Sequence, residues 1–344
     1  MQISYFCLRL KSVPGNIILS RTDSIGDAVL CMPVAKVLKD HFPDIRIGYL
    51  GREYTRQVVE ACVYIDQFIE YQDFLQHPVT MAGEPPQCIV HVLTERLIAS
   101  RAKELGIPLR IGTTNRLYHW HTCNRLVMLS RKRTTLHEAQ LNLRLLEPLG
   151  ISQRYSLEEI GRSYGLQPLA VLPEQVGNLV QKDKYNLILH PRSRGSAREW
   201  SLLNYIELTR SLDPAVYNIF ISGTKEERKS LQPLFEAVGD RVTDLTGQLT
   251  VRELITFIAQ CDGLVACSTG PLHLAAALGK DALGIYAPLH KIRPGRWGPL
   301  GPKARVFSVT RTCTDCFEMK APCHCINEVG WRSIKEELDK RSQR

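Results

Sequence analysis

Hydrophobic and polar residues alternate along the chain in blocks that predict strands followed by helices. In the first part, short apolar runs at 16–20, 45–50 and 88–93 predict buried strands, and each precedes a stretch with helical periodicity. Further short apolar runs lie at 110–112 and 126–129. Strands alternating with helices indicate a parallel sheet covered on both faces. The helices predicted here span about 27–41, 53–62, a segment ending near 105, and 135–149.

The same alternation restarts after residue 184. It predicts strands at 186–190, 217–222, 242–245, 263–267 and 282–286, and helices at 201–212, 225–238, 250–260, 272–279 and about 331–340. The segment 151–184 between the two patterns contains Gly and Pro at intervals, which indicates a linker with one possible strand at 168–172. The pattern therefore predicts two Rossmann-like α/β domains in tandem, with ligands bound beyond the carboxyl ends of the strands in the cleft between them.

The bulk composition fits two ordinary globular domains. The chain has 344 residues, of which 44% are hydrophobic and 23% charged. No run approaches the roughly 20 apolar residues that span a bilayer, and the N-terminus lacks a signal-peptide pattern, so we expect a cytosolic protein. We expect most of its eleven cysteines to be reduced thiols, with metal binding as the alternative.

The charge is positive and unevenly distributed. The formal net charge is +9, and residues 96–133 hold nine Lys or Arg residues against the single acid Glu104. Such an excess favours an anionic partner, although a solvated basic surface is the alternative. The chain lacks the interleaved basic and aromatic residues that stack nucleic-acid bases, so we expect no nucleic-acid partner. A nicotinamide cofactor is disfavoured because neither half carries G-x-G-x-x-G after its first strand.

A polar loop, RTDSIGD at 21–27, follows the first predicted strand. Gly26 permits a tight turn and the close approach of a ligand. Asp27 falls in the first turn of the next helix, at the positive end of its dipole. The alternative is that Asp27 only caps that helix.

Two loops of the second half have the chemistry of anion sites. The segment HPRSRGSAREW at 190–200 joins three arginines to two serines between a strand and a helix, which suits a diphosphate. The segment STGPLH at 268–273 leads from a strand into a helix through Gly270, and Pro271 fits the first helical position. His273 could reach the same ligand, although a lone histidine on a helix is more often structural.

A cysteine group lies near the C-terminus. It has a C-x2-C pair followed by a C-x-C pair, a spacing that resembles metal ligands. The two pairs lie closer together than those of zinc ribbons, which favours reduced structural thiols. The group comprises Cys313, Cys316, Cys323 and Cys325, with His324 between the last two.

In order along the chain, these segments resemble glycosyltransferase family 9, the ADP-heptose:lipopolysaccharide heptosyltransferases. The opening strand and S-x-G-D turn of that family resemble SRTDSIGDAVL, and its donor-phosphate loop resembles HPRSRGSAREW. The segment LTGQLTVRELITFIAQCD resembles the helix that precedes its donor strand. Its D-[ST]-G-x-x-H-x-A-A-A-L element resembles STGPLHLAAALG. The resemblance covers nearly the whole chain.

The resemblance implies an inverting α/β enzyme of the GT-B fold, with two Rossmann-like domains facing across a central cleft. It implies an N-terminal acceptor-binding domain at 1–165, a linker at 166–184 and a donor domain at 185–326. We expect a C-terminal helix at 327–344 that packs back toward the N-terminal domain. By analogy Asp27 is the general base, and the reaction needs no metal or other cofactor.

The resemblance also implies binding residues. Donor contacts are expected from the diphosphate loop and from the segment around Gly270, with Glu226 at the ribose and Leu249 beside the nucleobase. The full donor set is Ser193, Arg198, Glu226, Leu249, Ser268, Thr269, Gly270 and His273. Acceptor contacts are expected from Ser24, Gly26, Arg131 and Arg133. The implied acceptor is an anionic lipopolysaccharide inner core of the lipid A–Kdo type, reached by a transient peripheral contact with the cytoplasmic face of the inner membrane.

Two positions depart from the family pattern. Ser268 stands where the family has an acidic residue, and Arg192 stands where it has glycine. The missing carboxylate leaves open a GT-B transferase with another nucleotide sugar as donor. A non-catalytic nucleotide-sugar binding protein is the remaining alternative, against which the joint presence of Asp27, Arg198 and His273 argues.

Overall fold

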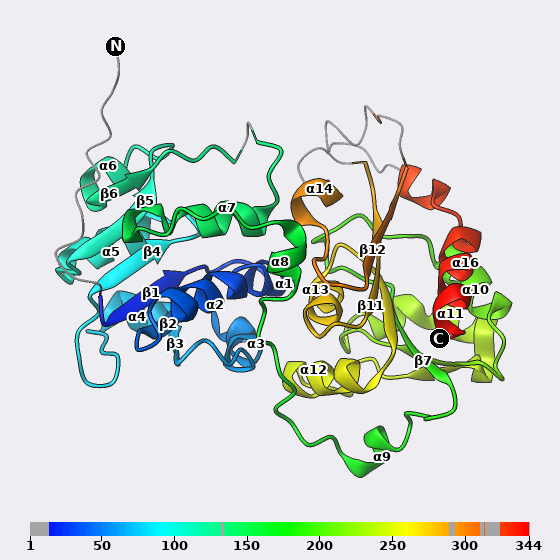
Figure 1. Ribbon diagram of the computed structural model, residues 1–344. Coiled ribbons are helices and arrows are strands. Elements are labelled where there is room, and N and C mark those ends of the chain that lie inside the picture. The colour runs from blue at the N-terminus through cyan, green and yellow to red at the C-terminus, as the bar shows by residue number, and fades with distance from the viewer. Residues whose placement is uncertain (1–13, 132–133, 289–292, 310–312, 314–323, 344) are drawn as a thin grey trace. The chain divides into compact units, whose positions relative to one another are not determined.

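The computed structural model describes residues 14–131, 134–288, 293–309, 313 and 324–343. The chain divides into two compact units, Met1–Gly165 and Leu166–Arg344. Each unit contains one six-stranded sheet whose strands all pair in parallel (Figure 1). Within the described ranges, no helix has both the length and the apolar character needed to cross a membrane.

The sheet of the first unit has the strand order β3-β2-β1-β4-β5-β6. Its central strand, β1, pairs with β2 on one side and β4 on the other, and its apolar residues Ile17, Ile18 and Leu19 are fully buried. The carboxyl ends of all strands therefore lie along one edge of this sheet. The six strands are β1 (Asn16–Ser20), β2 (Arg46–Gly51), β3 (Gln67–Glu70), β4 (Cys88–His91), β5 (Leu109–Thr113) and β6 (Arg125–Val127).

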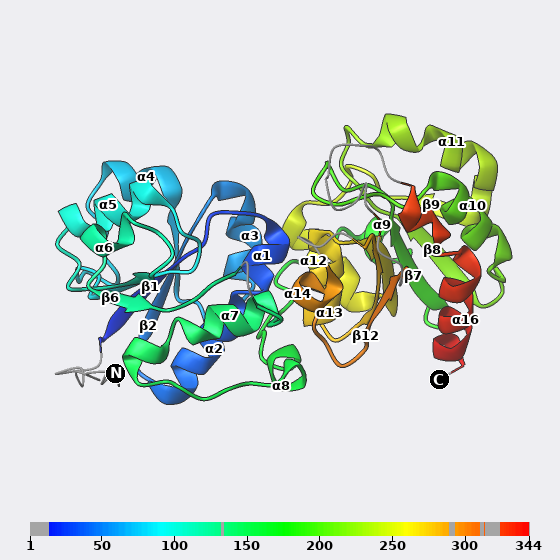
Figure 2. The same ribbon diagram turned by 90° about the horizontal axis from the view of Figure 1, so that it is seen from above.

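Helices cover the first sheet on both faces. One face packs α4 and α5 against Ile18, Ile69 and Ile89 of the strands, and α2 packs against α7 (Figure 2). The helices are α1 (Ile25–Val29), α2 (Met32–His41), α3 (Arg56–Glu60), α4 (Tyr71–Gln76), α5 (Arg96–Glu104), α6 (His119–Thr122), α7 (Glu138–Arg144) and α8 (Leu157–Gly161), with single 3₁₀ turns η1 (Glu53–Thr55) and η2 (Glu147–Leu149).

The helix predicted at 27–41 is two helices. It begins earlier, at Ile25, because Ser24 adopts extended dihedrals and caps α1. The helix then breaks at Leu30 and Cys31. Pro33 occupies the second position of α2. Its missing amide hydrogen is tolerated there, in the first turn of a helix, but the same proline would interrupt one continuous helix.

The sheet of the second unit has the order β12-β11-β10-β7-β8-β9. Its core joins Leu187 and Leu189 of β7 to Val265 of β10, Leu283 of β11 and the buried ring of Trp200. The strands are β7 (Tyr185–His190), β8 (Tyr217–Ile221), β9 (Val242–Asp244), β10 (Gly263–Cys267), β11 (Asp281–Tyr286) and β12 (Ala304–Ser308). The helices described here are α9 (Glu174–Gly177), α10 (Leu202–Ser211), α11 (Arg228–Val238), α12 (Val251–Gln260), α13 (Gly270–Ala277), α14 (Pro294–Trp297) and α16 (Trp331–Ser342), with η3 (Gly239–Arg241) and η4 (Cys325–Glu328).

One expectation about the second unit needs correction. The possible strand at 168–172 is absent, and Ala170 instead forms hydrogen bonds with the Thr256 hydroxyl of α12. The final helix, α16, buries Ile334 and Leu338 in the core of the second unit and packs against α10, because its apolar residues at i and i+4 form one stripe.

Candidate functional site

A carboxylate lies beyond the carboxyl end of β1, in the first turn of α1. The Ser24 hydroxyl lies 2.6 Å from Asp27 Oδ2 and also accepts the Asp27 amide at 3.4 Å. Arg21 donates to the other carboxylate oxygen of Asp27. The interpretation that Asp27 only caps the helix is therefore wrong, since Ser24 is the cap. The Asp27 side chain retains 15% exposure, so a ligand at this edge can reach it.

Arg21 holds Asp27 within a buried ionic network. Its guanidinium, only 2% exposed, donates to Asp23 at 2.9 and 3.0 Å. It also donates to Glu138 and Asn142 of α7, each at 3.2 Å. Burial raises the pKa of Asp23 to about 6, with Asp27 acting in the same direction and Arg21 opposing both. The network fixes the orientation of Asp27 from a rigid part of the unit.

Three of the four predicted acceptor residues, Ser24, Gly26 and Arg131, lie on or beside this network. Arg131 donates to Glu138 at 2.8 Å, to Asn142 at 3.3 Å and to the Val92 carbonyl at 2.9 Å. Arg131 is therefore tied to the same α7 residues as Arg21. Gly26 is buried in α1 beside exposed Ser24. Arg133 lies outside the described residues.

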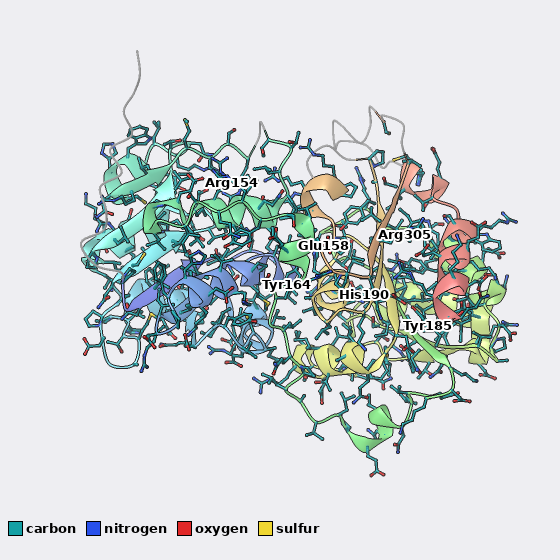
Figure 3. The ribbon with its side chains drawn as sticks, in the orientation of Figure 1. Arg154, Glu158, Tyr164, Tyr185, His190 and Arg305 are labelled. Carbon is teal, nitrogen blue, oxygen red and sulfur yellow. The ribbon has the colours of Figure 1, made fainter. Side chains whose placement is uncertain are left out.

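In the second unit, the loop 191–200 begins where β7 ends at His190 (Figure 3). Glu199 organises it: one carboxylate oxygen accepts the Ser193 amide at 2.8 Å and the other accepts Arg192 at 2.9 Å. The Ser193 hydroxyl lies 2.9 Å from the Ala197 carbonyl and 3.1 Å from Glu199. Ser193 therefore serves the loop's own hydrogen bonds in this structure.

The rest of this loop presents its basic residues. Arg194 has a positive φ of 50° and Gly195 one of 80°, a turn that leaves the Arg194 side chain exposed. Arg198 is half-buried. The Trp200 amide donates to Cys267 Sγ at 3.2 Å, which ties the end of the loop to the carboxyl end of β10.

The segment 268–273 follows β10, the neighbour of β7. Gly270 begins α13, and Pro271 occupies its first turn as predicted. Thr269 precedes the helix with extended dihedrals, yet its side chain makes no capping bond. Its hydroxyl is buried and has no hydrogen-bond partner among the described residues. Because a buried hydroxyl is costly to leave unpaired, Thr269 points to a ligand at this helix N-terminus.

The other expected donor residues lie nearby in the fold. Ser268 forms a hydrogen bond with the side chain of Tyr286, and His273 is buried in α13. Glu226 is exposed after β8, and hydrogen bonds from its own backbone and from Thr224 lower its pKa. Leu249 is half-buried before α12. All follow the carboxyl ends of strands in the same sheet.

Several residues of this edge were not predicted to have roles. Glu227 accepts the Thr224 amide at 2.7 Å, while its other oxygen is buried without a partner in the described part of the chain. His190 Nδ1 lies 2.9 Å from the Ser222 hydroxyl, and burial lowers the pKa of His190. The second acid in the run at 226–227 was the available signal for Glu227. No local pattern marks Glu138 or Asn142, since their contact with Arg21 joins distant segments.

The cysteine group is only partly visible. Cys313 and Cys325 are buried in the core of the second unit, whereas Cys316 and Cys323 lie outside the described residues. In the parts that the structure does describe, no group of three or more His, Cys, Asp or Glu side chains is arranged to hold a metal ion.

Comparison with known proteins assigns the family. The model of glycosyltransferase family 9 (heptosyltransferase) matches residues 106–327. A Haemophilus influenzae protein inferred to be a glycosyltransferase is 24% identical over 300 residues, covering 83% of this chain and 86% of that protein. A family 9 glycosyl transferase of Veillonella parvula has a similar structure, with a TM-score of 0.81 at 16% identity over 97% of this chain and 99% of that one.

The Escherichia coli ADP-heptose lipopolysaccharide heptosyltransferase II is also similar. Its TM-score is 0.75 at 17% identity, over 95% of this chain and 98% of that one. The structural similarities show the fold, that of GT-B heptosyltransferases, and the family model matches more than half of the chain. The chain therefore belongs to glycosyltransferase family 9, the heptosyltransferase family, and is a glycosyltransferase.

Proposed function

We propose that the enzyme transfers a heptose from ADP-heptose to an anionic lipopolysaccharide inner-core acceptor of the lipid A–Kdo or heptose type. The observation that carries the proposal is the Asp27 carboxylate, held by Arg21 and Ser24 at the edge where a parallel α/β sheet binds ligands. The similar E. coli structure is an ADP-heptose lipopolysaccharide heptosyltransferase, which supports this donor and acceptor.

In this proposal Asp27 is the general base. The acceptor hydroxyl loses its proton to Asp27 as its oxygen forms a bond to the anomeric carbon of the donor. The bond from that carbon to the diphosphate breaks on the opposite side, so the configuration inverts and ADP departs with the electron pair. Arg21 and Ser24 hold the carboxylate in place, which lowers the entropic cost of reaching the reactive geometry.

The departing diphosphate gains negative charge in the transition state. Arg198 and the exposed Arg194 supply positive charge on the 191–200 loop. Gly270 and Thr269, at the N-terminus of α13, supply backbone amides and the buried, unpaired hydroxyl. Ser193 acts by shaping the loop through Glu199.

The remaining expected contacts complete the donor site in this proposal. His273 and Ser268 border the same helix N-terminus, Glu226 binds the ribose and Leu249 lines the nucleobase pocket. Arg131, Ser24 and Gly26, with Arg133, meet the acceptor. The basic segment 96–133 draws the enzyme to the anionic cytoplasmic face of the inner membrane, where such an acceptor is anchored.

Ser268 favours one alternative, a different nucleotide-sugar donor. Its hydroxyl bonds to Tyr286 and supplies no negative charge at a position where the family has a carboxylate. Loss of one charge beside the donor changes which sugar hydroxyls or nucleotide groups the site prefers.

A donor panel followed by a transfer assay tests the proposal. The affinity of the purified enzyme for ADP, UDP, GDP, CMP and their sugars is measured by calorimetric titration. A ligand that binds the folded protein also stabilises it according to its occupancy. ADP and ADP-heptose should bind tightest, and mass spectrometry should detect one added heptose on a lipid A–Kdo acceptor. Tighter binding of UDP or GDP sugars would select the alternative donor. Donor binding without transfer to any acceptor would contradict the catalytic proposal.

A further inference from the structure

Four large apolar side chains of the first unit are exposed to solvent within a short stretch of sequence. Leu97 is 60% exposed, Leu117 85%, Trp120 58% and Met128 68%. Isolated exposed apolar residues are normal on protein surfaces, but a group of them rimmed by polar residues marks an interaction site.

Hydrogen bonds and helix packing join the segments that carry these side chains. The Trp120 indole donates to the Thr114 carbonyl at 3.0 Å, and the Thr114 amide donates to the Val127 carbonyl, also at 3.0 Å, next to Met128. Arg116, the neighbour of Leu117, donates to the Thr94 hydroxyl at 3.0 Å, just before α5 and Leu97. The helices α5 and α6 also pack against each other.

Positive charge surrounds these side chains. Arg96 and Arg116 are exposed immediately beside Leu97 and Leu117, and Lys103 is exposed on α5. The one acid of the segment, Glu104, pairs with Arg101 at 3.5 Å. Aliphatic and indole side chains surrounded by arginine and lysine match the interface of an anionic bilayer, where apolar groups enter the acyl boundary and cations meet headgroup phosphates.

We propose that Leu97, Leu117, Trp120 and Met128, with Arg96 and Arg116, form a membrane-docking surface that inserts into the headgroup region of an anionic phospholipid bilayer. This inference rests on the proposed function. It adds the insertion of apolar side chains to the charge attraction already proposed for residues 96–133. Tryptophan and leucine enter the interface, and the two arginines pair with phosphates around them.

The surface is continuous with the Asp27 edge of the same unit. Thr22, next to Arg21, donates to Glu95 at 2.7 Å, and Glu95 immediately precedes Arg96 and Leu97. Arg131 binds the Val92 carbonyl of the segment that leads to Thr94. Docking through this surface brings the bilayer beside the carboxylate, so that a lipid-anchored acceptor hydroxyl reaches Asp27 without leaving its membrane.

Vesicle binding at two salt concentrations tests the insertion. The full chain is mixed with vesicles of phosphatidylglycerol and phosphatidylethanolamine, some carrying brominated acyl chains. Trp120 is the single tryptophan of residues 1–165, so its insertion should quench fluorescence, and Trp120→Phe should remove that quenching. Binding should persist in part at roughly 1 M salt, where charge attraction is screened within about 3 Å.

The double variant Leu117→Ser/Met128→Ser keeps Trp120 as the reporter. It should weaken vesicle binding by about tenfold or more and abolish the salt-resistant fraction. Leu203→Ser, which alters a side chain 72% exposed on α10 of the second unit, is the matched control and should bind as the parent does. Arg96→Gln/Arg116→Gln should weaken binding at low salt only. Unaltered binding by Leu117→Ser/Met128→Ser would overturn the proposal.

Two further readouts separate the possible failures. Sedimentation detects the competing occupant: dimers that form with rising concentration and disappear in Leu117→Ser/Met128→Ser would show a self-association surface and overturn membrane docking. Transfer to a water-soluble inner-core fragment should be equal in parent and variant, while transfer to vesicle-anchored acceptor falls. Heptose transfer by an enzyme that does not bind vesicles would contradict only the proposed docking surface. Vesicle binding without transfer to either acceptor would contradict only the proposed function.

Discussion

At the scale of single residues, the first unit holds one carboxylate in a fixed direction. Arg21 and Ser24 occupy one lone-pair region on each oxygen of Asp27. A general base must accept a proton during the reaction, so part of the carboxylate has to stay accessible. The 15% exposure of its side chain marks the remaining access for the acceptor hydroxyl.

Substitution of Asp27 by Asn tests this role. The amide keeps the shape of the carboxylate but cannot take the proton, so kcat should fall by about 10²–10⁴-fold. Donor affinity should remain unchanged, because the expected donor residues all belong to the second unit. Steady-state transfer kinetics and calorimetry with ADP measure the two quantities. Asp44→Asn, an exposed carboxylate elsewhere in the unit, is the control, and an equal loss of donor binding in Asp27→Asn would contradict the assignment.

The residue scale also shows where sequence reasoning ends. Asp27 and the 268–273 segment could be singled out from the sequence because they follow buried strands, at the edge where parallel sheets bind ligands. Glu138 and Asn142 could not be found, since α7 meets Arg21 only after the chain has folded across more than a hundred residues. Glu199 was not predicted, although a single acidic residue in a basic loop can accept hydrogen bonds from several of its neighbours, as Glu199 does from Arg192 and the Ser193 amide.

At the scale of elements, the central strands and the edge strand β9 were predicted from the sequence, whereas two other edge strands were not. The strands β1, β7 and β10 are largely buried and form short, mostly apolar runs, as is typical of the central strands of a parallel sheet. The edge strands β3 and β12 are half-exposed, with mixed sequences QFIE and ARVFS, and were missed. The helix α16 was predicted as a helix, and the structure buries its apolar stripe in the core of the second unit.

The end of β4 carries a histidine with an unusual environment. His91 is fully buried, and neither ring nitrogen has a hydrogen-bond partner among the described residues. Burial, helped by His119 and Arg110, lowers the pKa of His91 to about 3. Burial also lowers the pKa of His119, whose ring centroid lies 5.4 Å from that of His91.

This pair predicts loss of stability in mild acid. Between the ordinary histidine pKa of about 6.5 and the lowered value, the unfolded chain binds more protons than the folded one, so the free energy of unfolding falls as pH decreases. His91 alone accounts for a loss of about 2 kcal/mol at pH near 5. Urea unfolding between pH 7 and 5 measures it. His91→Leu should flatten the profile, exposed His121→Asn should not, and a profile unaffected by His91→Leu would refute the explanation.

At the scale of the whole molecule, the chain builds two sheets, one in each compact unit. Among the described residues, the core of the second unit runs from Leu187 to Leu338. Sequence alternation predicted this division because the strand–helix pattern stops and restarts around the Gly- and Pro-containing segment. The expected roles of the two units, acceptor binding and donor binding, come from the family resemblance and not from the alternation.

The division into two units predicts that donor nucleotide slows amide hydrogen exchange mainly in the second unit. At about 100 times its Kd, ADP stabilises the form that binds it by about 2.7 kcal/mol, which slows exchange of amides that open with that unit by up to about 100-fold. Hydrogen exchange should therefore slow in β7, β10 and α13, and remain within a few-fold of its free rate in β1, β4 and α2. Asp27→Asn should give the same map, whereas Arg198→Ala should need more ADP to produce it. Equal slowing in both units would mean that they open together or share the donor, and would contradict the assignment of donor binding to the second unit alone.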